Sequence, residues 1–548
     1  MALRDRGLAQ LRRLGAPLLF AALAVLHTWP LASDPAGLSR LDNADTTLNT
    51  WIVAWVAHAL RTAPLALFDA PIFHPSPDAL AFSEHLFVPA LMGAPLSWAG
   101  VPPVLVYNLL VLAGFALSAW AMSHVVARWT GSGAAGLVAG AAYAFNAHLL
   151  TRLPHLQALH VEFFPLALLA LDAVLDGEAG EPRPPWRAGA ALGGLFALQA
   201  LCSNYTLVFL SFALVAAVAV RPDAWLRRPR AAWPALALAG LVGLALVAPF
   251  LWPYYRVNQD QGMTRSIEEV ARYSAGWRDY LVTGGRLHYD LWSHAFFEGR
   301  TALFPGVVVT GLAGVALATG AWWRDRRARM LVALGLGGVL MSFGPALPGY
   351  TWLHAHVPLL QGIRGAARWG WLGLVAVAGL AGFGVARLER RWGATPWWPA
   401  IAVGLLGLVT LEAMRAPMGF VPPPEVSPVY RAVAADPRAI VAEFPLFPAA
   451  AIERNARYLL PAASHFRPLV NGYSGFVPER YARDAEVLRA FPSDAAVTRL
   501  RALGVTRVVL HVDAFLAERG EDALRAVGWR ADLELLEEDG DVRLYRLK

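Results

Sequence analysis

Long runs of apolar residues recur along most of the chain. A helix that crosses a membrane needs about 20 mostly apolar residues, and eleven runs are close to that length. They cover residues 14–32, 101–123, 132–149, 160–176, 187–203, 205–220, 232–251, 302–323, 329–346, 367–386 and 396–414. A further run at 86–100 is shorter and contains prolines, which favours a re-entrant or interfacial segment. The pattern predicts an α-helical polytopic membrane protein.

The pattern changes after about Pro422, within the proline-rich segment VPPPEVSPVY. Two short apolar runs predict buried strands, two amphipathic stretches predict helices, and the last residues predict a hairpin that turns at Asp539-Gly540. These segments cover 439–446 and 505–513, 478–491 and 494–504, and 533–548. We therefore expect two domains: residues 1–421 in the membrane, and residues 422–548 as a small α/β domain outside it.

The arginines near the apolar runs predict the orientation of the chain. If the N-terminus is cytoplasmic, the inside loops are rich in arginine and the short outside loops are poor in it, as the positive-inside rule requires. No clear cleavage site follows the first run, which favours an uncleaved first span. We expect a multi-pass protein of the bacterial inner (plasma) membrane with a periplasmic or extracellular C-terminal domain. The inside arginines are Arg128, Arg183, Arg187, Arg221, Arg227, Arg228, Arg230, Arg324, Arg326, Arg327, Arg329, Arg387, Arg390 and Arg391.

Composition agrees with this interpretation. Hydrophobic residues make up 57% of the chain and charged residues only 16%, and the mean hydropathy is +0.44. A soluble globular protein has roughly a quarter charged residues. The net charge of +7 lies largely in loops beside the apolar runs, so it does not indicate nucleic-acid binding. The single cysteine, Cys202, excludes an intrachain disulfide.

Acidic residues stand out in the stretch LDNADTTLNTWIVAWVAHAL, which we expect outside the cytoplasm. Asp42 and Asp45 precede a helix on which Trp51, Trp55 and His58 recur at helical spacing. Such an aromatic face suits a helix that lies in the membrane interface. One alternative is that Asp45 only caps the helix. A catalytic role is compatible with capping, because a helix N-terminus keeps a carboxylate ionised.

Other polar groups follow in the loops expected on the same side. Glu84 and His85 precede the run at 86–100; a solvated loop is the default explanation, and a second catalytic or metal-binding pair is the alternative. The connection around Arg152 is rich in histidine, but it contains no H-E-x-x-H pattern. A cationic surface for a phosphate is therefore favoured there over a metal site. Its polar residues are His148, Arg152, His155, Gln157, His160 and Glu162.

Arginines and a tyrosine complete the candidate residues. Arg364 and Arg368 are four residues apart, which places them on one face of a helix, and Arg256 belongs to the same expected side. One alternative is that these arginines only extend to lipid headgroups, but the positive-inside rule disfavours arginines on the outside. Binding of a lipid-linked phosphate at the outer membrane surface would explain their presence there. Tyr473, in RPLVNGYSGF, suits stacking on a sugar; a structural loop is the alternative.

Several of these segments, in this order, resemble the GT-C superfamily of polytopic glycosyltransferases, including its family-39-like and YfhO-like bacterial members. The resemblance extends from about residue 25 to about residue 515. It implies a bundle of about 11 to 13 helices with a catalytic first external loop. The segments that carry it are LDNADTTLNTWIVAWVAHAL, FSEHLF, RLPHLQALHVEFFPLALL, EGRTALFPGVVVTGLAG, IRGAARW, VAEFPL and HFRPLVNGYSGFVPERY.

The resemblance also implies roles for individual residues. In that superfamily an acidic residue of the first external loop acts as the base on a polyprenyl-phosphate-linked sugar. The matching position is Asp45, with Asp42 second, and Glu84 matches a further acidic group. His85, Arg152, His155, Gln157, Arg256, Arg364, Arg368 and Tyr473 would contact substrate. No motif requires a metal, so the cofactor is open, a divalent cation included.

The expected function is a membrane glycosyltransferase with inversion at the anomeric carbon. Its partners would be a polyprenyl-phosphate sugar, membrane lipids and an extracytoplasmic glycan, lipid or protein acceptor, and no nucleic acid. One rival is a transporter or flippase of lipid-linked glycans, but such proteins usually carry ionisable residues in mid-span, where this chain has few. The other rival is a non-catalytic membrane scaffold.

Overall fold

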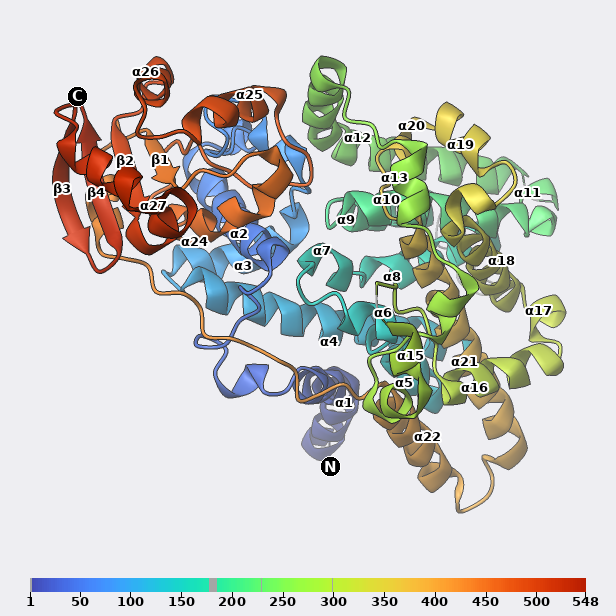
Figure 1. The fold of residues 1–548 in the computed structure, drawn as a ribbon. Helices are drawn as coiled ribbons and strands as arrows, with labels where there is room; N and C mark the ends of the chain where they lie inside the picture. Colours follow the sequence, from blue (N-terminus) through green and yellow to red (C-terminus); the bar gives the residue numbers. More distant parts are fainter. Residues whose placement is uncertain (1, 177–184, 228, 298) are drawn as a thin grey trace. The chain divides into compact units, whose positions relative to one another are not determined.

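The structure is a computed structural model that describes residues 2–176, 185–227, 229–297 and 299–548. It is mostly helical, with one four-stranded sheet near the C-terminus (Figure 1), and this confirms the predicted fold class. The chain folds as two compact units. Unit 1 comprises Met1–Asp34, Leu109–Phe250 and Thr264–Gly419, and unit 2 comprises Pro35–Asn108, Leu251–Met263 and Phe420–Lys548.

Unit 1 is a bundle of helices, and each of the predicted spans contains a helix. Two helices, α4 (Pro103–Thr130) and α12 (Pro229–Gln261), contribute residues to both units. The other long helices are α1 (Ala2–His27), α5 (Gly133–Ala144), α8 (Phe163–Asp176), α9 (Pro185–Ala200), α10 (Asn204–Ala219), α16 (Val307–Ala318), α18 (Arg326–Ser342), α21 (Trp371–Trp392) and α22 (Trp398–Ala413). Short helices connect them: α6 (Ala147–Leu150), α7 (Leu156–Leu159), α11 (Pro222–Arg227), α13 (Ile267–Arg272), α14 (Arg286–His288), α15 (His294–Phe297), α17 (Ala321–Arg324), α19 (Tyr350–His356), α20 (Pro358–Gln361) and the 3₁₀-helix η7 (Ala366–Gly370).

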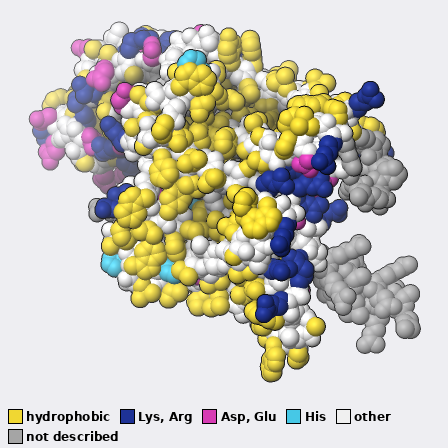
Figure 2. Space-filling view, turned by 90° about the vertical axis from the view of Figure 1, so that its right-hand side faces the viewer, with side chains coloured by type: hydrophobic (Ala, Val, Ile, Leu, Met, Phe, Trp, Pro, Cys, Tyr) yellow, Lys and Arg dark blue, Asp and Glu magenta, His cyan; other side chains and the backbone are white. Residues whose placement is uncertain are grey.

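The helices have the length and composition of a multi-pass membrane protein. Among the described residues, five helical stretches are long and apolar enough to cross a membrane, and five more are apolar but shorter. The most apolar part of α21 is 83% buried, so α21 lies inside the bundle; that of α12 is only 22% buried. Broad hydrophobic areas cover the face drawn in Figure 2. Such areas are expected where helices face lipid. The long stretches are Pro103–Thr130, Gly133–Leu150, Leu156–Asp176, Pro229–Gln261 and Ala366–Trp392.

Small residues let the central helix α21 approach its neighbours closely. A Cβ on Gly384 would lie 2.0 Å from the backbone oxygen of Leu312 on α16, and a Cβ on Gly335 of α18 would lie 2.3 Å from Cβ of Ala376. Neither contact is possible for a larger side chain. Association of membrane helices depends on such close backbone packing, because lipid provides no hydrophobic driving force between them.

Unit 1 also contains a buried group of ion pairs, which the sequence did not predict. Arg221 is fully buried; its Nη1 donates to Oδ1 of Asp172 at 2.7 Å, and its Nη2 donates to Asp176. Arg327 donates to the other oxygen of Asp172 at 2.7 Å, and Arg326 to Asp176 at 2.7 Å. Arg221 lies in the connection between α10 and α11, where a loop arginine was expected, and Asp172 is an ionisable residue within a predicted span.

We expect Asp172→Asn to destabilise the protein strongly. The substitution would remove one of the two carboxylates that pair with the buried Arg221, and breaking a buried ion pair typically costs about 3–5 kcal/mol. Thermal unfolding of the detergent-solubilised protein, followed by tryptophan fluorescence, measures the loss. Asp223→Asn is the matched control, because Asp223 is 33% exposed and lies 3.5 Å from Arg326; such a pair contributes about 1 kcal/mol or less. Equal midpoints for the two variants would contradict the structural role of Asp172.

Unit 2 contains the predicted sheet and helices of the C-terminal region. The strand order is β1-β2-β4-β3, where β1 (Val441–Phe444) and β2 (Arg507–His511) are parallel and β3 (Leu533–Asp539) and β4 (Val542–Leu547) form the predicted hairpin. Gly540 turns the hairpin with φ +58°, a conformation that glycine adopts without strain. The helices are α2 (Ala44–Thr62), α3 (Phe87–Trp98), α23 (Val429–Ala435), α24 (Leu459–Ala462), α25 (Glu479–Leu488), α26 (Asp494–Ala502), α27 (Val512–Trp529) and the 3₁₀-helix η8 (Ala449–Tyr458).

The loop between α2 and α3 is hydrogen-bonded to a distant segment of the same unit. The backbone N–H groups of Phe73 and His74 donate to the oxygens of Asn471 and Leu469 at 3.1 and 2.9 Å. In return, Leu469 N–H donates to Pro71 oxygen at 3.0 Å, and Phe476 N–H donates to Phe82 oxygen at 3.0 Å. The first predicted external segment therefore folds together with residues of the C-terminal region.

The aromatic face of α2 lies in the interior of unit 2. Trp51 is 0% exposed and Trp55 is 8% exposed. Trp55 packs against Phe466 with ring centroids 5.9 Å apart, and His58 stacks on Phe466 at 4.3 Å. The predicted placement of this face in the membrane interface was therefore wrong: the rings cover a core formed with the C-terminal region.

Candidate functional site

Asp45 lies in the first turn of α2. The N-cap of this helix is Asn43, whose Oδ1 accepts a hydrogen bond of 2.9 Å from the N–H of Asp45. The alternative that Asp45 is the cap was therefore wrong. Oδ1 of Asp45 accepts a hydrogen bond of 2.7 Å from the hydroxyl of Tyr473. The helix N-terminus and the phenol donor both favour the ionised carboxylate.

Asp42, the second candidate base, is exposed and paired. Its Oδ1 accepts from Nε of Arg40 at 3.1 Å, and its Oδ2 accepts from Nη2 at 3.4 Å. Its side chain is 45% exposed. Both carboxylate oxygens of Asp42 are thus occupied by one guanidinium. Of the two aspartates, Asp45 has the geometry that better suits proton transfer.

Glu84 and His85 lie in the turn before α3. His85 is buried: its Nδ1 accepts from the N–H of Phe87 at 3.2 Å, and the rings of Phe68 and Tyr254 pack edge-on against it. Burial lowers the pKa of His85 to about 3, so the ring is neutral at ordinary pH. These contacts support the turn. Glu84, beside it, is half-buried.

Arg256 is paired with an acidic residue of unit 2. Its Nη2 donates to Oδ1 of Asp78 at 2.7 Å; the arginine side chain is 51% exposed and that of Asp78 only 9%. Burial raises the pKa of Asp78, and Arg256 partly opposes this effect. The guanidinium of Arg256 thus neutralises a loop carboxylate, and its exposed half is left for a further contact.

The cationic candidates of unit 1 meet in one small pocket. Arg152, His155, Gln157 and Arg368 all line a cavity of about 40 Å³. They come from separate elements: the first three surround the break between α6 and α7, and Arg368 belongs to η7. Pro154 lies at that break, where a continuous helix would be interrupted. Four of the candidate substrate contacts therefore line one pocket.

Further polar groups face the same pocket, among them side chains that the sequence analysis missed. Arg368 lies over the ring of Tyr205 at 4.4 Å, and Ser203 caps α10 by accepting from the N–H of Tyr205 at 3.2 Å. Two buried ring nitrogens of the lining, Nδ1 of His148 and Nε1 of Trp371, have no hydrogen-bond partner among the described residues. Buried polar atoms are usually satisfied. Two arginines beside such atoms make a setting suited to a small anion.

The other members of the predicted cationic group lie elsewhere. Arg364 precedes η7, and its guanidinium covers the ring of Tyr273 at 5.0 Å. The spacing of Arg364 and Arg368 predicted that they share one face of a helix. This prediction was wrong, because Arg364 lies before the helix that contains Arg368. His160 is buried between Glu162, at 3.0 Å from Nδ1, and the oxygen of Leu110, at 3.1 Å from Nε2. In the described parts of the chain, no group of three or more His, Cys, Asp and Glu side chains could hold a metal.

The predicted site residues thus form two groups, one in each unit. Asp42, Asp45, Glu84, His85, Arg256 and Tyr473 belong to unit 2, and Arg152, His155, Gln157, Arg364 and Arg368 belong to unit 1. The carboxylates are all in the first group, and most of the arginines are in the second.

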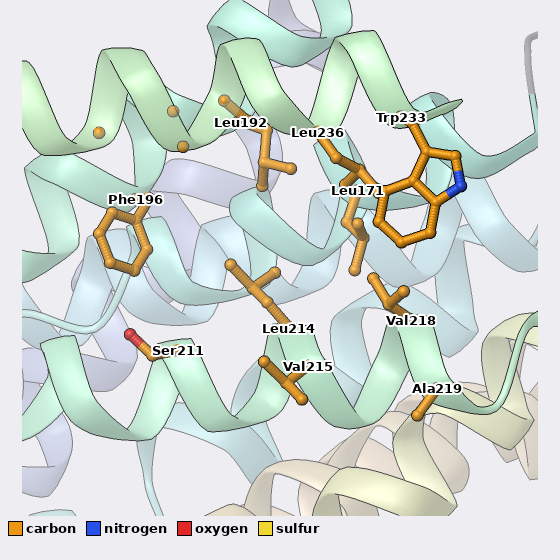
Figure 3. Close-up of a pocket in the computed structure, with 14 residues that line it drawn as sticks. Leu171, Leu192, Phe196, Ser211, Leu214, Val215, Val218, Ala219, Trp233 and Leu236 are labelled. Carbon is orange, nitrogen blue, oxygen red and sulfur yellow. The ribbon is translucent and has the colours of Figure 1, made fainter. Parts of the chain in front are cut away.

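Unit 1 also contains a large apolar pocket among α8, α9, α10 and α12 (Figure 3). Its volume is about 540 Å³, and the labelled side chains are almost all hydrocarbon, with Ser211 and Trp233 as the polar exceptions. None of the lining residues is ionisable. The pocket therefore suits hydrocarbon and supplies no acid or base.

Comparison with solved structures identifies the fold. The arabinofuranosyltransferase AftD from Mycobacteria superposes with a TM-score of 0.62 at 17% identity, over 98% of this chain and 40% of that one. ArnT from Cupriavidus metallidurans, bound to undecaprenyl phosphate, superposes with a TM-score of 0.52 at 15% identity, over 97% of this chain and 98% of that one. The oligosaccharyltransferase AglB from Archaeoglobus fulgidus was solved in complex with an inhibitory peptide and a dolichol-phosphate. It superposes with a TM-score of 0.50 at 12% identity, over 92% of this chain and 70% of that one.

These neighbours confirm the predicted GT-C fold. The chain spans 40% of the AftD chain that it matches. No protein-family model and no curated protein sequence matches it. The fold and the apolar helices together establish a multi-pass membrane protein.

Proposed function

We propose that the protein transfers a sugar from a polyprenyl-phosphate donor to an acceptor outside the cytoplasm. The observation that supports this proposal is the pocket of unit 1, where Arg152 and Arg368 lie beside two buried ring nitrogens that have no hydrogen-bond partner among the described residues. A phosphate can accept hydrogen bonds from both guanidinium groups and from the indole N–H of Trp371. The solved neighbours support this chemistry, since ArnT and AglB hold undecaprenyl phosphate and dolichol phosphate.

In the proposed reaction Asp45 accepts the proton of the acceptor hydroxyl. The hydroxyl oxygen attacks the anomeric carbon and forms the new glycosidic bond, and the bond between that carbon and the phosphate oxygen breaks. The electron pair leaves with the phosphate, whose negative charge cationic side chains stabilise. Attack opposite the leaving group inverts the anomeric carbon. The chemistry needs only a base and a stabilised leaving group.

The proposal includes an orientation in the membrane. The arginine distribution favours a cytoplasmic N-terminus and an external unit 2. Asp42 stays the second candidate for the base and Glu84 a further acidic group, while His85, Gln157, His155, Arg256 and Arg364 stay candidate substrate contacts. The proposal leaves open whether the reaction uses a divalent cation.

A transporter of lipid-linked glycans and a non-catalytic scaffold are the rival functions. Transporters place ionisable side chains along a mid-membrane path. The buried Asp172 and Arg221 of unit 1 instead satisfy each other at 2.7 Å, close to the ends of α8 and α10. This arrangement favours a structural role for that pair over a transport path.

Purified protein in liposomes tests the proposal. The donors are undecaprenyl phosphates that carry single hexoses or pentoses, the acceptor is a cell-envelope extract, and mass spectrometry follows release of undecaprenyl phosphate. With at least one donor, we expect release of undecaprenyl phosphate. The amount released should equal the amount of sugar that the acceptor gains. Appearance of intact donor in the opposite leaflet without release would support a transporter. Neither release nor movement with any donor would support a scaffold.

A further inference from the structure

Tyr473, in the C-terminal region, donates a hydrogen bond to the proposed base. Its hydroxyl donates to Oδ1 of Asp45 at 2.7 Å, although 428 residues separate the two in the chain. Both side chains are half-buried, so solvent only partly screens the bond. A hydrogen bond of this length is well formed, and one to an ionised carboxylate is roughly twice as strong as a neutral one.

The backbone around Tyr473 is held by several independent contacts. Asn471 is fully buried, and its amide pairs with the backbone of Glu443 on β1: Nδ2 donates to the oxygen at 2.9 Å, and Oδ1 accepts from the N–H at 2.8 Å. Gly472 passes directly over the ring of Phe73, where a Cβ would lie only 2.7 Å from a ring carbon. The position of Tyr473 is therefore defined from both the sheet and the loop before α3.

We infer that Tyr473 is a positioning residue that orients the carboxylate of Asp45 and keeps it ionised, so that the C-terminal region completes the catalytic unit. This inference rests on the proposed function and goes beyond it. A carboxylate that accepts a strong hydrogen bond takes up a proton less readily. The same bond limits rotation of the carboxylate group, which fixes the direction in which it can accept a proton.

This role differs from stacking on a sugar, the role that the sequence suggested for Tyr473. Stacking depends on the face of the ring, whereas positioning depends on the hydroxyl. Tyr473→Phe keeps the ring and removes only the hydroxyl, so it separates the two roles. If Tyr473 only stacks, this variant keeps its rate and its pH profile.

The test is the pH dependence of kcat in the liposome transfer assay. For Tyr473→Phe we expect kcat to fall about 10-fold near neutral pH, and the acidic limb of the profile to move up by about one pH unit. KM for the acceptor should stay within about twofold, since no proposed substrate contact is removed. Replacement of Tyr473 by a fluorinated tyrosine, a stronger donor of similar shape, should move the acidic limb to lower pH.

A matched control separates this effect from loss of a buried hydroxyl in general. The hydroxyl of Tyr481 donates to the oxygen of Phe447 at 2.6 Å and accepts from Asn455 at 2.8 Å, within the same unit. Tyr481→Phe is expected to lower the midpoint of thermal unfolding without moving the acidic limb. The inference would be overturned if the acidic limb of the pH profile stays in place in folded Tyr473→Phe. It would also be overturned if the acidic limb moves equally in Tyr473→Phe and Tyr481→Phe.

Failure of the inference and failure of the proposed function give different results. If Asp45→Asn retains transfer, the proposed base is wrong. If Asp45→Asn is inactive and Tyr473→Phe behaves as wild type, only the role of Tyr473 is wrong. Should Tyr473→Phe unfold, the fluorinated variant still decides the question, because it keeps every contact of the ring.

Discussion

Asp45→Asn is expected to lower the transfer rate by about 10²–10⁴-fold, the contribution typical of a general base. The amide has nearly the same shape as the carboxylate but cannot accept a proton. Because Asn43 and not Asp45 caps α2, the helix should keep its N-terminus in the variant. Thermal unfolding and binding of donor are therefore expected to stay close to wild type. The measurement is the rate of undecaprenyl phosphate release at saturating donor.

Asp42→Asn provides the comparison for Asp45→Asn. Asp42 is exposed and forms an ion pair with Arg40, and exposed pairs contribute about 1 kcal/mol or less to stability. We expect this variant to retain most of the activity. Loss of activity in Asp42→Asn with full activity in Asp45→Asn would exchange the roles of the two aspartates and would leave the rest of the proposal in place.

Arg368→Gln is expected to lower kcat by about 10²–10³-fold, as does removal of one group that stabilises developing charge. Its guanidinium lines the pocket of unit 1 beside His148 and Trp371, where the leaving phosphate would gain charge. Affinity for the donor should fall as well, because the phosphate is charged before the reaction. Arg368→Lys restores the charge but not the planar fork, so only partial recovery is expected.

The control for Arg368 is an arginine outside the pocket. Arg278 is exposed and lies over the ring of Trp277 at 5.3 Å. Arg278→Gln should leave donor binding and release unchanged. Binding of undecaprenyl phosphate to the detergent-solubilised protein, measured directly, separates affinity from rate. Equal donor binding and equal rates for Arg278→Gln and Arg368→Gln would remove Arg368 from the phosphate site.

Much of the fold follows from local pattern. The apolar runs are long enough that each contains a helix, and the alternation in the last residues is enough to predict β3 and β4 as a hairpin. The environment of a helix face is harder to predict. Trp51 and Trp55 have the spacing of a membrane-interface helix, but the same spacing suits a core, and the deciding partner, Phe466, lies far along the chain.

The candidate site was predictable where each residue alone carried a signal. The positive-inside rule disfavours arginines in loops expected outside the cytoplasm, and this feature made Arg364 and Arg368 candidates. Their local geometry was not predictable: a spacing of four predicts a shared helix face, yet Gly365 precedes η7, and Arg364 lies outside that helix. The bond between Tyr473 and Asp45 has no local signal at all, because nothing near either residue indicates the other. Trp371, an apolar residue by composition, was missed for the same reason.

The pairing of the loop 71–82 with residues 469–476 has a consequence for biosynthesis. During translation the ribosome makes Asp45 first and Tyr473 428 residues later. At about 5–20 residues per second, that interval lasts about 20–90 s. Throughout that interval the early loop has been made without its hydrogen-bonding partner. Among the described residues, a nascent chain halted before residue 469 contains all the long helices of unit 1 but lacks the segment that pairs with this loop.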